Sequence, residues 1–165
     1  MSVEITLDDK DSTDIYSGKF ETHPESIPYT KEQLESIINI FDDRIAHRTY
    51  DDFSKTVEGD LDFNLGEKAK FVFDTFGCIR AGVNFTTGAV VDVVEDTKWW
   101  RQHHAKTSEI NKYVMFIHDD AGDVFVDNGD NVYVAAKKDD ESYEISNLNE
   151  DIITFICKRI LKALC

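Results

Sequence analysis

Carboxylates are the side chains of this chain whose number and placement could support a specific chemistry. The 165 residues contain 33 Asp and Glu against 18 Lys and Arg, a formal net charge of −15. Residues 1–62 hold 16 acids against 6 bases, and residues 119–144 hold 9 acids against 2 bases. A field of this sign attracts cations and basic macromolecules and repels nucleic acid and anionic membranes. The pattern favours recognition of a basic partner, and the alternative is that the acidity only keeps the protein dispersed in solution.

Two acidic groups and a tryptophan pair are the predicted recognition residues. The first group is Asp119, Asp120, Asp123, Asp127, Asp130, Asp139, Asp140 and Glu141. The second group is Asp42, Asp43, Asp51 and Asp52. Trp99 and Trp100 are flanked by Lys98 and Arg101, and Trp and Arg are enriched in binding hot spots. The alternative is that one indole caps the core while the other lies across a surface groove.

Metal sites are not predicted. His103 and His104 are adjacent, so neither a helix nor a strand would aim both at one ion, and no HExxH pattern occurs. The stretch DDAGDVFVDNGDN, residues 119–131, lacks the alternation and the closing glutamate of an EF-hand loop. Its acids fit hairpin turns and strand edges better.

The sequence lacks the catalytic motifs of nucleophilic and phosphate-binding enzymes. The chain has no G-x-S-x-G elbow and no glycine-rich loop with a lysine for phosphate. Cys78 lies in an apolar strand pattern, where a thiol is usually buried and inert, and pairing with His103 or His104 is the alternative. A pair of catalytic carboxylates stays open, because 33 acids single out no pair. We expect that the protein is not an enzyme and that it binds no cofactor.

Three helices are expected, two within residues 30–56 and one over residues 149–164. Thr30 to Gln33 form a capping box, and apolar residues at helical spacing then predict a helix of about 16 residues within 30–47. A short helix is expected around 50–56. A final helix is expected over 149–164, with a wide apolar face and basic residues in its last turns.

Strands are expected elsewhere, where apolar and polar residues alternate. The predicted strands are residues 3–7, 68–74, 78–85, 89–95, 113–118, 123–127 and 131–136. Hairpins are predicted at 76–77, 86–88 and Asn128-Gly129. Residues 96–111 are expected to form a short helix or an excursion. The fold class is α+β in a single domain over 1–165: a mostly antiparallel sheet of about six strands with two principal helices packed on it.

The cellular compartment is expected to be the cytoplasm. No apolar run approaches the ~20 residues that span a bilayer, and the N-terminus lacks the basic and apolar segments of a secretion signal. The three cysteines are odd in number and widely spaced, which predicts reduced thiols.

The C-terminal third resembles a known family. Residues 112–127 read KYVMFIHDDAGDVFVD, residues 131–135 read NVYVA, and residues 143–156 read YEISNLNEDIITFI. This order of a hydrophobic strand, a Gly-containing turn, an alternating acidic strand, a further strand and a Phe-bearing helix is similar to the end of the SUKH superfamily of immunity proteins. The family's Leu-Pro entry and Asn-Gly-Gly segment are absent upstream. The resemblance implies binding of basic nuclease toxins through variable surfaces, so no functional residue carries over.

Charge and resemblance together predict an acidic immunity protein that binds and neutralises a basic, nuclease-type antibacterial toxin, without direct contact to nucleic acid or membrane. Electrostatic attraction would raise the association rate above the ~10⁵–10⁶ M⁻¹s⁻¹ of uncharged partners. Two alternatives stay open. One is a DNA mimic or phage anti-defence inhibitor. The other is a small ligand-binding domain or enzyme with a pocket near Trp99 and Trp100.

Overall fold

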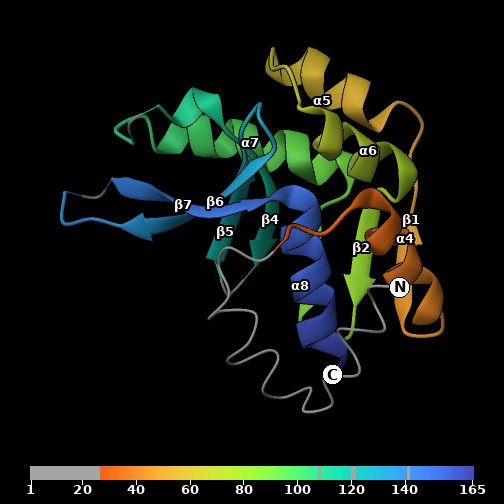
Figure 1. The fold of residues 1–165 in the computed structure, drawn as a ribbon. Helices are drawn as coiled ribbons and strands as arrows, with labels where there is room; N and C mark the ends of the chain where they lie inside the picture. The colour runs from red at the N-terminus through yellow and green to blue at the C-terminus, as the bar shows by residue number, and fades with distance from the viewer. Residues whose placement is uncertain (1–26, 108, 120–121, 141) are drawn as a thin grey trace.

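The protein is an α+β fold built on two separate antiparallel sheets (Figure 1). The computed structural model describes residues 27–107, 109–119, 122–140 and 142–165; the strand expected at 3–7 lies outside them. The first sheet has the order β1 (Ile45–Arg48), β2 (Cys78–Ala81), β3 (Phe85–Thr86). The second is a meander of β4 (Val114–Asp119), β5 (Gly122–Val126), β6 (Asn131–Lys137) and β7 (Tyr143–Asp151).

Five α-helices pack around these sheets in the described part of the chain. They are α4 (Lys31–Ile40), α5 (Phe53–Leu61), α6 (Glu67–Thr75), α7 (Val90–His103) and α8 (Ile152–Leu164), with a short 3₁₀ turn η2 (Ile110–Lys112). The expected α+β class is therefore confirmed, whereas the single six-stranded sheet with two principal helices is wrong. None of the helices in the described ranges is long and apolar enough to span a bilayer.

Helix α8 is the centre of the main core. It contacts strands of both sheets as well as α4 and α6, and Figure 1 shows it between the two sheets. Nine of its residues are buried: Ile152, Ile153, Thr154, Phe155, Ile156, Cys157, Ile160, Leu161 and Leu164. Burial of one large aliphatic side chain stabilises a fold by about 1.5–3 kcal/mol, so the buried apolar residues of this helix contribute strongly to the core.

The second sheet is covered on both faces. Val114, Phe116 and Val126 belong to the main core on the α8 side. On the opposite face, Trp100 of α7 packs with Met115 and Phe125 in a smaller second core. The sheet therefore fixes the position of α7 relative to β4 and β5.

Two predicted strands are helices. Residues 68–74 lie in α6, where Ala69, Val72 and Phe73 are buried at helical spacing. Residues 89–95 lie at the start of α7, which continues through the tryptophans to His103. Valine and phenylalanine favour strands only weakly, and burial of a helical face outweighed that preference here. The segments 76–77 and 86–88 are consequently junctions between a helix and a strand instead of hairpins.

Other boundaries differ for similar reasons. The first predicted helix ends at Ile40, because a turn at 41–44 leads into β1. The helix expected around 50–56 is α5, and the strand expected over 78–85 is the β2–β3 hairpin, which turns at Gly82 with a φ of +64°. The last helix begins at Ile152, and the strand β7 before it was missed. The capping box at Thr30, the three strands β4 to β6 and the Asn128-Gly129 turn are confirmed.

Candidate functional site

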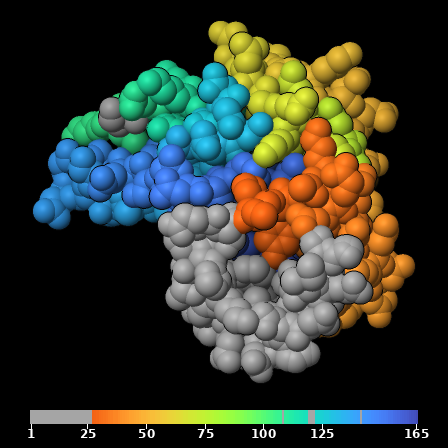
Figure 2. All heavy atoms as spheres, viewed as in Figure 1, coloured from red at the N-terminus to blue at the C-terminus, as the bar shows by residue number. Residues whose placement is uncertain are grey.

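The acids predicted between 119 and 144 do not lie side by side. Asp119 and Asp123 lie next to the turn that joins β4 to β5. Asp127 and Asp130 lie at the other end of β5, in the turn that leads to β6. Asp139 and Asp140 lie in the β6–β7 turn. Because β5 pairs with β6 only from Val124 to Val126, the two hairpins diverge. Figure 1 shows the β6–β7 hairpin as an arm that projects away from β4 and β5, and in Figure 2 its blue atoms lie along the green atoms of α7.

Asp127 holds the β5–β6 turn together. Its carboxylate accepts hydrogen bonds from the backbone N–H groups of Gly129 (2.8 Å) and Asn131 (2.9 Å) and from the Tyr133 hydroxyl (2.7 Å). Burial opposes ionisation of Asp127, but these hydrogen bonds outweigh it and lower the pKa of the carboxyl. Burial and the hydrogen bond to Asp127 raise the pKa of Tyr133 to about 12. Asp127 is therefore a structural residue.

Asp130 caps a helix that is distant in sequence. Its carboxylate accepts hydrogen bonds from Ala69 N (2.8 Å) and Lys68 N (3.2 Å) in the first turn of α6. Its backbone carbonyl accepts from Ile152 N (2.9 Å) at the start of α8. The exposed N–H groups at the start of a helix favour a carboxylate, so Asp130 joins three elements. Asp127 and Asp130 thus both hold the fold together, so substitution of either would disturb it.

The remaining predicted acids differ in their engagement. Asp140 accepts hydrogen bonds from the backbone N–H and the hydroxyl of Ser142, which close the β6–β7 turn. Five acids are exposed and make no side-chain hydrogen bond or ion pair with other described residues: Asp42, Asp43, Asp51, Asp52 and Asp139. Asp120 and Glu141 lie outside the described residues, as does the side chain of Asp119.

The two tryptophans occupy different environments. Trp100 is 1% exposed and donates a hydrogen bond from Nε1 to Asp123 Oδ2 (2.8 Å). Trp99 is 47% exposed and stacks on His103, with ring centroids 4.5 Å apart and planes 19° from parallel. This arrangement agrees with the alternative expectation from the sequence, in which one indole packs in a core and the other lies at a surface groove.

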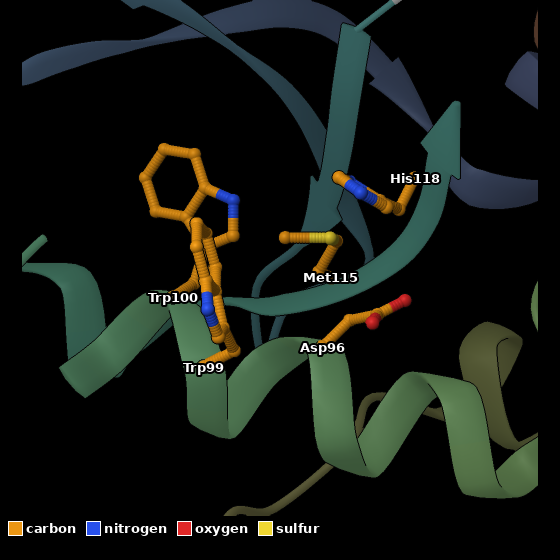
Figure 3. A pocket seen from close by; sticks show the side chains of 5 residues that line it. All are labelled: Asp96, Trp99, Trp100, Met115 and His118. Carbon is orange, nitrogen blue, oxygen red and sulfur yellow. The ribbon is translucent and has the colours of Figure 1, made fainter. Parts of the chain in front are cut away.

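A small pocket lies between α7 and β4, and Trp99 forms one side of it (Figure 3). Its volume is about 210 Å³, and it is lined by Asp96, Trp99, Trp100, Met115 and His118. Figure 3 shows the Trp99 indole edge-on, with Asp96, Met115 and His118 on one side of its plane. The pocket thus combines one aromatic face, one thioether and titratable groups from two elements.

A β-bulge in β4 brings Met115 and His118 to the same pocket. Residues three apart on a regular strand point to opposite faces. The register of β4 shifts between Met115 and Ile117, so Phe116 and Ile117 together face the main core opposite Val124. The extra residue reverses the alternation, which places His118 on the α7 side with Met115. Without the bulge the imidazole would face the main core.

The charged groups of the pocket are not equally paired. His118 Nδ1 lies 2.5 Å from Asp123 Oδ1, and the other oxygen of Asp123 accepts from Trp100. Across the described ranges, by contrast, the Asp96 carboxylate makes no hydrogen bond or ion pair. Burial raises the pKa of Asp96; His118 opposes the shift, while Asp92, Asp123 and Glu95 add to it. Asp96 is therefore the carboxylate of the pocket whose charge is least compensated.

Arg101, which flanks the predicted tryptophan pair in the sequence, is structural. Its guanidinium donates to the carbonyls of Leu61 (3.0 Å), Asn111 (3.3 Å) and Tyr113 (3.3 Å). Burial lowers the pKa of Arg101, with Asp62 opposing the shift. Arg101 joins the end of α5 to α7 and η2, so mutation of this residue would test the fold and not recognition.

Neither thiols nor metal ligands form a site in the ranges that the structure covers. No group of three or more His, Cys, Asp or Glu there could hold a metal ion. Burial is the largest cause of the raised pKa of both Cys78 and Cys157, so these thiols are poor nucleophiles at neutral pH. No protein-family model matches the chain, and no curated protein is significantly similar to it.

Three pocket residues were not singled out from the sequence: Asp96, Met115 and His118 as a set. One signal could have found Asp96, which lies one helical turn before Trp99 if residues 90–103 are read as a helix. No comparable signal exists for Met115 and His118, because their common face depends on the bulge.

Proposed function

We propose that this protein is a binding domain that neutralises a basic protein partner, a nuclease-type antibacterial toxin. The observation that carries the proposal is the set of exposed acids that make no ion pair with other described residues. Asp42 and Asp43 lie in the turn before β1, Asp51 and Asp52 in the turn after it, and Asp139 in the β6–β7 turn. Their charges are available to an incoming cation without breaking a structural bond.

The exposed acids act mainly on the association rate and on the salt dependence of binding. Exposed ion pairs contribute little individually, about 0–1 kcal/mol, because water and salt screen them. Their summed field steers a basic partner and raises the association rate. A binding domain of this kind therefore gains speed and selectivity from its acids, while its affinity needs at least one anchoring contact. The likeness of residues 112–156 to SUKH immunity proteins supports the same class of function.

The test uses the polypeptide encoded beside the gene of this protein, produced in a bacterial cell with and without it. Protection of the cells and a purified complex are the expected results. The informative variant neutralises the unpaired acids around β1: Asp42→Asn, Asp43→Asn, Asp51→Asn and Asp52→Asn. We expect slower association and a weaker dependence of the association rate on salt. Asp127 and Asp130 are unsuitable for this test because their loss would disrupt the fold.

A matched control removes the same charge from other exposed positions: Glu32→Gln, Glu35→Gln, Asp60→Asn and Glu144→Gln. If both quadruple variants slow association equally, the turns around β1 are not the recognition surface. If the neighbouring polypeptide is not toxic, or if this protein gives no protection from it, the immunity function is wrong. Inhibition of a DNA-binding enzyme without protection from a toxin would favour the DNA-mimic alternative.

A further inference from the structure

We propose that the pocket between α7 and β4 binds the guanidinium group of an arginine from the basic partner, stacked on the Trp99 indole with its N–H groups on the Asp96 carboxylate. This inference rests on the proposed function, since it supplies the anchor that an acidic surface lacks. The size of the pocket, the aromatic face and the charge distribution each lead to it.

The size of the pocket limits its ligand to a group as small as one side chain. Pockets for drug-sized ligands and cofactors occupy about 300–1,000 Å³. The volume here is about 210 Å³. Its mouth lies beside an indole that is 47% exposed, so a side chain can enter from solvent without movement of the main core. A single protruding residue is therefore a suitable occupant.

The indole of Trp99 lines the pocket, while His103 stacks on the ring and His104 meets it in a T-shaped contact with centroids 5.3 Å apart. His103 lies one helical turn after Trp99, whereas Asp96 lies one turn before it. His103 and Asp96 thus flank the indole on opposite sides along α7. The side that Figure 3 shows toward Asp96 and Met115 is the wall of the pocket. The face of an indole attracts cations, and a planar guanidinium stacks on it better than an ammonium does.

The charge of the pocket selects a cation. Asp123 is held by the Trp100 N–H and His118, whereas Asp96 has no such partner among the described groups. Burial and the carboxylates of Asp92, Asp123 and Glu95 disfavour the ionised form of Asp96, and His118 offsets only part of their effect. A guanidinium at hydrogen-bond distance would offset both effects, and it can form two parallel N–H···O bonds with the carboxylate. A neutral ligand would add no charge compensation to that of His118.

The experiment is an NMR titration of the ¹⁵N-labelled protein with N-acetyl-arginine amide. The chain has only two tryptophans, so the two indole N–H signals report on the pocket directly, and Trp99→Phe assigns them. We expect the Trp99 signal to shift saturably with the arginine amide and to stay unchanged with the neutral isostere N-acetyl-citrulline amide. Equal shifts with citrulline amide, or no saturable shift with either compound, would overturn the proposal. Equal binding of N-acetyl-lysine amide would overturn the assignment to a guanidinium.

Two variants locate the binding site. Asp96→Asn, followed by the Trp99 indole signal, and Trp99→Ala, followed by the indole signal of Trp100, which also lines the pocket, should each weaken binding of the arginine amide about fivefold, as expected for loss of an ion pair or a cation–π contact worth about 1 kcal/mol. Glu95→Gln is the matched control, because Glu95 is exposed on the same helix and does not line the pocket. Equal losses in all three variants would mean that only the general field of α7 attracts the cation.

Failure of this inference is distinguishable from failure of the proposed function. Binding of the arginine amide without any protection from a toxin would keep the pocket and reject the immunity function. Protection that survives Asp96→Asn and Trp99→Ala, with no saturable shift of the Trp99 signal, would keep the function and reject the pocket as its anchor.

Discussion

Asp130 occupies the space that a side chain on Gly66 would need. A Cβ atom at Gly66 would lie 2.3 Å from Asp130 Oδ1, far inside the contact distance of these atoms. The same oxygen accepts the hydrogen bond from Ala69 N at the start of α6. The absence of a side chain at Gly66 therefore lets a residue of the β5–β6 turn cap this helix.

Gly66→Ala should destabilise the protein by about 1–2 kcal/mol, the usual consequence of losing a helix N-cap. The methyl group would displace the Asp130 carboxylate from the N–H groups of α6. Urea denaturation followed by circular dichroism measures the change in the free energy of unfolding. Gly59→Ala is the control, because Gly59 lies within α5 and an added Cβ would meet no described atom within 4 Å. It should stabilise the protein by up to about 1 kcal/mol; an equal loss in both variants would contradict the proposed capping.

Asp127→Asn should destabilise the protein by about 2 kcal/mol at pH 7, because several hydrogen bonds to a charged acceptor are weakened together. The folded-state pKa of Asp127 lies below its ordinary value of 3.8. The ionised carboxylate therefore stabilises the fold above that value, and the contribution is lost as the pH falls through the lowered pKa. Urea denaturation at a series of pH values should show the difference between variant and wild type shrinking below about pH 4. A difference that is constant down to about pH 2 would show that charge is not involved.

Asp96→Asn should have the opposite effect on stability at pH 7. The folded-state pKa of Asp96 is raised above 3.8, so its ionisation destabilises the fold as the pH rises through the raised value. The variant should be more stable than the wild type at pH 7, by less than about 1 kcal/mol because the side chain is only partly buried. The difference should disappear below about pH 4, where the carboxyl is protonated in both states. Loss of stability at pH 7 would indicate a structural partner for Asp96.

Arg101→Ala should destabilise the protein by about 2–3 kcal/mol, since three backbone carbonyls lose a charged donor. Arg101→Lys should recover only part of this loss. An ammonium lacks the planar fork with which the guanidinium reaches carbonyls of both α5 and η2. Thermal unfolding compares the two variants. Lys98→Ala is the control, an exposed cation on the same helix that should change stability by less than about 0.5 kcal/mol.

Elements whose signals are local were predictable from the amino-acid order. The Thr30 capping box needs only residues 30–33, and the Asn128-Gly129 turn needs only its own two residues and the flanking alternation. Strands β4 to β6 and the apolar face of α8 follow from short-range periodicity. In each case the interactions that form the element lie within a few residues of one another, so the pattern is complete in a short window.

Elements and roles that depend on distant residues were not predictable. The choice between strand and helix in α6 and α7 was made by the surfaces that bury Val72, Phe73 and Val93, because alternation and helical spacing overlap in such short apolar runs. Asp130 lies 61 residues from Ala69 in the sequence, so it becomes a helix cap only when the β5–β6 turn meets the start of α6. The pocket depends on one extra residue in β4, which turns His118 toward Trp99 and Met115. Net charge is additive along a chain, but the direction in which each carboxylate points is set by packing that no short segment contains.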